Sequence, residues 1–388
     1  MAPSLRVVLF GACDRHNLGD LLFPHVVAAL LPAPPLAVAG LVARDLRPFG
    51  GHLVRPLSEL AAEQGEPHVL VHVGGEILTC SVVDAALMLA TSHEPATALQ
   101  ARLAAAGAAP YVADRRRAGR QARIVHCAVG GCELDDAPAE LRRTVLAALA
   151  EADWVGVRDR LTEATLRHHG LNCVLMPDGA VLTRALFGPR IAQHAAQGEV
   201  AGLRQRFPEG WLAVQFSLDF ADGASLAGLA AACDHLAART GLPLVLFRAG
   251  AAPLHDDLAL YRAVLARLAP GTRAWLFESL DIWDICAVIA QSHGYLGSSL
   301  HGRIVALLYG LPRVSLGLDH RRPRKLHAFV STWEVADVPG VLPPAQAAEA
   351  LLAQLGAPAA PSLAHADALA ARCRGTMAAW ISRLLTPV

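Results

Sequence analysis

The sequence predicts an α/β protein built from two Rossmann-like domains, and three observations support this. Short apolar segments alternate with Ala-rich or amphipathic segments through the first half of the chain, and the same alternation starts afresh near Trp211. Such alternation is typical of parallel sheets covered by helices. The chain also has 388 residues, more than one compact core usually holds.

Composition limits the classes of function. Hydrophobic residues make up 54% of the chain and charged residues 18%, with 34 basic residues balancing 34 acidic ones. Because no long basic run is present, nucleic acid is not an expected partner. We expect neither a membrane span nor a signal peptide, since the apolar runs are too short or are interrupted. Eight cysteines without a Cys-x-x-Cys pair favour a cytoplasmic location; a homo-oligomer stays open.

The order of elements defines the domains. We expect an N-terminal Rossmann-like domain over 1–190, a polar connection at 188–208, a second such domain over 191–343, and closing helices over 344–388. In the first domain, strands are predicted at 5–10, 36–42, 68–73, 124–129, 154–157 and 173–176. In the second they are predicted at 211–216, 242–247, 273–277, 294–297 and 313–316. Two such domains with parallel sheets facing a central cleft form a GT-B-like architecture.

Polar residues follow several strands of the first domain. The loop after the first strand carries Asp14, Arg15, His16, Asn17 and Asp20. Loops at this end of a strand commonly carry function, although Asp20 could simply cap the next helix. Other strands end in Gly74-Gly75-Glu76, in Arg158 and in Asp178. Two glycines let another group approach the backbone closely, but they also suit a plain turn.

The stretch 294–312 carries the main candidate of the second domain. A strand, a Ser-Ser-Leu-His-Gly turn and a buried helix place His301 and several backbone N–H groups at the carboxyl edge of a sheet. Open α/β sheets bind their ligands at that edge. The alternative is that His301 only bonds to backbone at a helix start. Neither Gly-x-Gly-x-x-Gly nor a P-loop motif occurs, and no clear metal cluster is found, so we expect no metal and no bound cofactor.

Five segments, in register over nearly the whole chain, resemble the polysaccharide pyruvyl transferase family. They are GACDRHNLGD (11–20), HVGGEIL (72–78), VGVRDRLTEATLRHHG (155–170), VLMPDGAVL (174–182) and GSSLHGRIVALLYGLPRVSL (297–316). The resemblance implies a GT-B-like fold and transfer of a pyruvyl group from phosphoenolpyruvate to hydroxyls of a sugar or glycan, in polysaccharide biosynthesis. Phosphoenolpyruvate is then a co-substrate, and the other partner is the sugar.

The resemblance also suggests a role for each residue. His301 would be the general acid, with Asp20 and Arg158 as the other catalytic residues. Arginines suit the donor's phosphate and carboxylate. The donor-binding set is Arg158, Ser299, Leu300, His301, Arg303 and Lys325, and the acceptor-binding set is Asp14, Asn17, Asp20, Gly74, Gly75 and Glu76. Arg158 could instead pair with Asp153 or Asp159, and Asp178 could only orient a turn.

One position departs from the family pattern. Ser299 stands where the family has an arginine before Leu-His, and serine carries no charge for the donor. Arg303 or the basic run 320–325 could replace that charge. Two alternatives therefore remain: a GT-B-type glycosyltransferase or related transferase that uses a sugar nucleotide, with Glu278 or Asp284 at the ribose, and a non-catalytic sugar-binding homologue.

Overall fold

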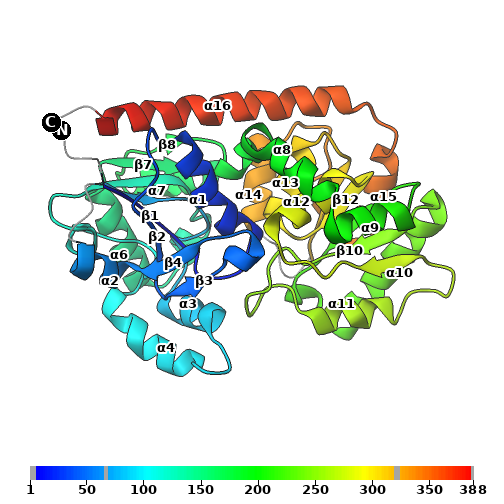
Figure 1. Cartoon of the computed structure of the whole chain (residues 1–388), viewed down its shortest axis with the longest axis horizontal. Coiled ribbons are helices and arrows are strands. Elements are labelled where there is room, and N and C mark those ends of the chain that lie inside the picture. Colours follow the sequence, from blue (N-terminus) through cyan, green and yellow to red (C-terminus); the bar gives the residue numbers. More distant parts are fainter. Residues whose placement is uncertain (1–5, 65–68, 319–323, 386–388) are drawn as a thin grey trace. The chain divides into compact units, whose positions relative to one another are not determined.

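The computed structural model describes residues 6–64, 69–318 and 324–385 (Figure 1). Contacts between Cα atoms divide the chain into two units, the first formed by 1–182 with 370–388 and the second by 183–369. The division therefore precedes a helix, α8 (Thr183–Ala195), whereas the sequence placed the boundary inside it, at 190. Among the described residues, no helix has the length and apolar character needed to cross a membrane.

The first unit contains an eight-stranded sheet in the order β3-β4-β2-β1-β5-β6-β7-β8. All neighbouring strands are parallel except β3 and β4. The strands are β1 (Val7–Phe10), β2 (Ala37–Gly40), β3 (Arg44–Asp45), β4 (Leu53–Pro56), β5 (Val69–His72), β6 (Arg123–Val129), β7 (Trp154–Val157) and β8 (Val174–Leu175). Its helices are α1 (Leu18–Leu30), α2 (Leu57–Gln64), α3 (Val82–Leu89), α4 (Ala96–Leu103), α5 (Arg115–Ala118), α6 (Ala139–Ala150) and α7 (Arg160–His168).

The second unit contains a six-stranded, fully parallel sheet in the order β11-β10-β9-β12-β13-β14. The strands are β9 (Leu212–Gln215), β10 (Leu244–Leu246), β11 (Ala274–Leu276), β12 (Gly294–Gly297), β13 (Arg313–Leu316) and β14 (Val341–Leu342). Its helices are α8, α9 (Gly198–Arg206), α10 (Gly223–Thr240), α11 (Leu258–Leu265), α12 (Ile282–Ala290), α13 (Leu300–Leu308), α14 (Arg324–Trp333) and α15 (Pro344–Gln354). The last helix, α16 (Ala359–Leu385), is divided between the units at residue 369.

Local chemistry explains where these elements lie. The central strands β1, β5 and β9 are buried along their whole length, which fits continuous apolar runs covered on both faces. Helix α1 begins after Asn17, whose side chain accepts hydrogen bonds from the Gly19 and Asp20 N–H groups at 3.2 and 3.4 Å. The cap is therefore Asn17 and not Asp20.

Several expectations from the sequence were wrong. The segment 188–208 is not a connection but belongs to α8 and α9, which bury Ile191, Val200 and Leu203 and expose polar residues on the other face. Strands β3, β4 and β14 and helix α14 were not predicted. The sequence also suggested that the arginine-rich segment 114–123 is a solvated surface segment. Its Arg117 guanidinium instead donates to the carbonyls of Ala106, Pro110 and Val112.

Candidate active site

In the first unit, predicted site residues gather where β1, β5, β7 and β8 end. These strands are parallel, and β6 lies between β5 and β7, so their carboxyl ends share one edge of the sheet. Gly74 and Gly75 have φ angles of 132° and 91°, which other residues rarely adopt. A Cβ atom on Gly75 would lie 3.1 Å from Asp20 Oδ1. The structure therefore brings together Asp20 and the glycine pair, which belong to the predicted acceptor-binding set.

Arg158 follows β7 at this edge and binds two carboxylates. Its guanidinium contacts Glu76 and donates to Asp178 Oδ2 at 3.1 Å, and only 4% of its side chain is exposed. Burial acts to lower the pKa of Arg158, but the charges of Glu76 and Asp178 outweigh it and raise that pKa. The guanidinium thus stays charged, and two carboxylates already neutralise it. This pairing differs from the partners Asp153 and Asp159 considered from the sequence, and it leaves Arg158 less suited to hold a phosphate.

The two carboxylates of the loop after β1 are both buried but have different partners. Asp14 is fully buried and accepts hydrogen bonds from Leu41 N, Val42 N and Tyr111 Oη at 2.6, 3.2 and 2.7 Å. Asp14 therefore connects this loop to its neighbours, which argues against its predicted contact with an acceptor sugar. Asp20 is 6% exposed and accepts from Arg15 Nε at 3.1 Å. Of the loop carboxylates, Asp20 is therefore the one placed beside the glycine edge.

The second unit presents His301 at the carboxyl edge of its own sheet. Ser299 caps α13 by accepting from Gly302 N at 3.2 Å, and its own N–H donates to Gln215 Oε1 at 2.7 Å. Leu300 and His301 form the first turn of the helix and are 3% and 9% exposed. The turn predicted at this point is thus the helix start, and Ser299 has a structural role that an arginine would not fill in the same way.

The two expected replacements for the missing arginine lie elsewhere or outside the described residues. Arg303 is fully buried, donates to Glu334 Oε1 at 2.9 Å and to Ser315 Oγ at 3.1 Å, and is therefore committed to the interior. These interior hydrogen bonds argue against the predicted role of Arg303 in donor binding. In the basic run 320–325, residues 320–323 lie outside the described part of the chain, and Lys325 is exposed on the first turn of α14.

Sequence reasoning missed two buried polar residues at this edge. Asp256 Oδ2 accepts from Gln215 Nε2 at 2.9 Å, from Ala249 N at 2.6 Å and from Gly250 N at 3.3 Å. Burial raises the pKa of Asp256 to about 6, although these hydrogen bonds and the charge of Lys325 act to lower it. Because Gln215 in turn accepts from Ser299 N, the Asp256–Gln215 pair fixes the start of the helix that carries His301. A polar residue ending an otherwise apolar strand was the available signal.

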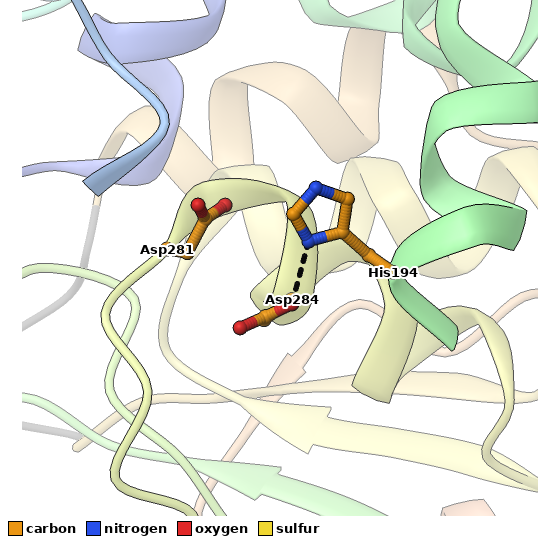
Figure 2. A group of neighbouring side chains, drawn as sticks. All are labelled: His194, Asp281 and Asp284. Carbon is orange, nitrogen blue, oxygen red and sulfur yellow. Dashed lines mark hydrogen bonds and ion pairs between the residues drawn. The ribbon is translucent and has the colours of Figure 1, made fainter. Parts of the chain in front are cut away.

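A third polar group lies on the α8 side of the second unit (Figure 2). His194 projects from α8 toward Asp284, and its Nδ1 lies 2.6 Å from Asp284 Oδ1. Asp284 also accepts from Ser279 Oγ at 2.6 Å, while Asp281 caps α12 by accepting from Trp283 N at 2.8 Å. The ligand atoms lie within 4.8 Å of one another, as in a metal site, but each already serves a hydrogen bond of the fold. The carboxylate of Asp284 is therefore already engaged by His194 and Ser279, which argues against a role in binding a ribose.

Comparisons with known proteins address the family and the fold. A model of a family described as polysaccharide pyruvyl transferase matches residues 123–320, which is just over half of the chain. No curated protein matches the chain.

Solved structures match over nearly the whole length. A putative UDP-N-acetylglucosamine 2-epimerase from Listeria monocytogenes is similar at 13% identity and a TM-score of 0.58, with 100% of this chain and 98% of that one covered. MnaA of S. aureus with UDP gives 13% identity and a TM-score of 0.59, covering 98% and 97%. The Neisseria meningitidis UDP-GlcNAc 2-epimerase bound to UDP-GlcNAc gives 12% identity and a TM-score of 0.59, and the match covers 98% of each chain. These likenesses confirm the predicted GT-B-like fold with two Rossmann-like sheets.

Proposed function

The chain belongs to the polysaccharide pyruvyl transferase family, and from this premise we propose that it moves a pyruvyl group from phosphoenolpyruvate onto two hydroxyls of a sugar or glycan. The observation that carries the proposal is the family match across 123–320, a span that contains both Arg158 and His301. The position of His301 at the start of α13, on the carboxyl edge of a parallel sheet, supports it, because that edge is where such folds bind ligands.

The reaction needs an acid and a hydroxyl activated for attack. Protonation of the methylene carbon of phosphoenolpyruvate makes the adjacent carbon oxocarbenium-like, and a sugar hydroxyl attacks that carbon. A second hydroxyl then replaces the phosphate at the same carbon, which gives the cyclic ketal. One hydroxyl proton restores the acid and the other leaves with phosphate. The imidazolium of His301 suits the acid because histidine transfers protons near neutral pH.

The first unit supplies the acceptor side of the proposal. Asp20 lies beside Gly75, where no side chain intervenes, and its carboxylate is a suitable acceptor for a hydroxyl proton. Asn17 is half-buried and engaged as the α1 cap, so its role is to hold the loop. Glu76 is held by Arg158 and by Cys132 N, which donates to Glu76 Oε1 at 2.9 Å. Its role is therefore to shape the edge.

Binding distinguishes the donors. At one hundred times its dissociation constant, phosphoenolpyruvate should stabilise the full-length protein by about 2.7 kcal/mol in thermal unfolding. The parallel titration uses UDP-N-acetylglucosamine. Stabilisation by the sugar nucleotide and none by phosphoenolpyruvate would replace the pyruvyl donor with a sugar nucleotide.

Turnover tests the role of His301. Phosphate release from phosphoenolpyruvate is measured with methyl glycosides whose diols can form a ketal. His301→Asn should still bind the donor but release no phosphate, while the matched variant His293→Asn, at the amino end of β12, should behave like the wild type. Unchanged turnover in His301→Asn would remove the proposed acid. Acceptor binding without product from any donor, in the wild type, would indicate a sugar-binding protein.

A further inference from the structure

The donor side of the proposed site needs a cation that the family pattern does not supply here. Ser299 is a neutral helix cap, and Arg303 is bound by Glu334 in the interior. Lys325 is exposed on the first turn of α14. A small anionic donor bound next to His301 requires a fixed positive charge.

Arg248 follows β10 at about the same height along the sheet as the start of α13, the helix that carries His301. In the parallel ladder, Leu246 of β10 and Leu296 of β12 are both in register with Val214 of β9. Counting two residues onward places Arg248 level with Ser298, next to Ser299. The two positions are two strand spacings apart, about 10 Å, so an anion between them can contact both an arginine side chain and the start of α13.

Hydrogen bonds fix the backbone on both sides of Arg248. Phe247 N donates to Val214 O at 3.0 Å, and Ala249 N donates to Asp256 Oδ2 at 2.6 Å. The same Asp256 oxygen accepts from Gln215, whose other end accepts from Ser299 N. One network therefore holds both the residue after Arg248 and the cap of the His301 helix, so the two cannot shift independently.

Among the described residues, no carboxylate forms an ion pair with the guanidinium of Arg248. Its side chain is half-buried, and its Nε is buried without a hydrogen-bond partner among the described residues. No ion pair of its guanidinium occurs in that part of the chain either, although Asp256 lies close by and accepts from three N–H groups instead. A half-buried cation with an unsatisfied N–H is costly unless an anion binds there.

We infer that Arg248 binds the phosphate or carboxylate of the donor and supplies the charge that Ser299 lacks. This inference rests on the proposed function for the identity of the donor, but the anion site itself does not depend on it. The guanidinium fork matches either group, since both present two oxygens to parallel N–H donors. Arg248 would thus be the residue that lets this chain keep an anionic donor with serine at 299.

The test compares Arg248→Gln with wild-type full-length protein by calorimetric titration of phosphoenolpyruvate and, separately, of inorganic phosphate at constant ionic strength. Loss of a charged hydrogen-bond donor should weaken phosphoenolpyruvate binding about 10- to 100-fold. The affinity of Arg248→Lys for phosphoenolpyruvate should lie between those of the wild type and Arg248→Gln. The control is Arg273→Gln, which removes an exposed arginine just before β11, at the opposite edge of the same sheet, and should bind as the wild type does. In Arg248→Gln/Ser299→Arg, the relocated arginine should restore affinity.

The outcomes separate this inference from the proposed function. Equal affinity of Arg248→Gln and wild type for phosphoenolpyruvate would overturn the inference and leave the function standing. Phosphate binding that depends on Arg248, without phosphoenolpyruvate binding, would support the anion site and contradict the donor. Binding of neither anion by the wild type would overturn both. If Arg248→Gln fails to fold, the Lys variant decides: unchanged affinity for both anions would also overturn the inference.

Discussion

Replacing Glu334 by Gln should destabilise the second unit strongly, because this carboxylate holds two buried arginines. Glu334 accepts from Arg303 Nε at 2.9 Å and from Arg313 Nε and Nη2 at 2.8 and 2.6 Å. The side chains of Glu334, Arg303 and Arg313 are 1%, 0% and 2% exposed. Gln keeps the shape but removes the charge, which leaves two cations in the interior. Breaking such a buried pair costs about 3–5 kcal/mol.

The loss is measurable by calorimetry or by urea unfolding followed through tryptophan fluorescence. For a unit of this size, about 3–5 kcal/mol corresponds to a fall in melting temperature of roughly 6–20 °C. The control is Glu349→Gln, whose carboxylate is 62% exposed and pairs with His235; its effect should stay within about 0.5 kcal/mol. A Glu334→Gln protein that unfolds like the wild type would refute the account of this cluster, and with it the reason for excluding Arg303 from the donor site.

Two further predictions concern the first unit. The rings of His72 and His126 stack in its core, with their centroids 3.9 Å apart. Burial lowers the pKa of His72 to about 3 and that of His126 well below its usual value. The unfolded chain therefore binds more protons below pH 6.5, so stability should fall on acidification, for His72 alone by about 2 kcal/mol at pH 5. His126→Leu should reduce the loss between pH 7 and pH 5 in urea unfolding, and an unchanged loss would contradict the pairing of neutral rings. Gly130→Ala would place a methyl group against Glu76 Oε2 and Arg158 Nε, so it should lower the free energy of unfolding by about 1–3 kcal/mol. The control Gly202→Ala in α9 has open space at its Cβ and should not destabilise the protein. Equal melting temperatures of the two glycine variants would show that the side chains of Glu76 and Arg158 can move aside without a loss of stability.

Much of the fold follows from local sequence. Apolar runs ending in glycine or in a charged residue predicted the long parallel strands, and β7 occupies the predicted residues 154–157. Strands β3 and β14, which were not predicted, are only two residues long, and no periodicity can define so short an element. The error over 188–208 has another cause, because Gly188 and Pro189, residue types that usually interrupt a helix, lie within α8.

The candidate site was predictable in position but not in its pairings. That Asp20, Gly75, Arg158 and His301 lie at carboxyl edges follows from the order of strands and loops. The burial of Asp14 by Leu41, Val42 and Tyr111 could not be predicted, since these partners lie 27 to 97 residues away in the sequence. Arg303 likewise pairs with a glutamate 31 residues onward. Whether a charge serves a ligand or the fold depends on such distant partners.

The distribution of charge over the two edges supports the division of labour between the units. At the edge of the first unit, the cations Arg15 and Arg158 are each paired with carboxylates, so a second anion would meet repulsion there. A neutral sugar with many hydroxyls meets no such penalty, since carboxylates accept hydrogen bonds readily. At the edge of the second unit, Asp256 is satisfied by N–H groups, while Arg248 has no carboxylate partner among the described residues. These charges support the proposal that the anionic donor binds at the edge that carries His301 and the sugar at the edge that carries Asp20.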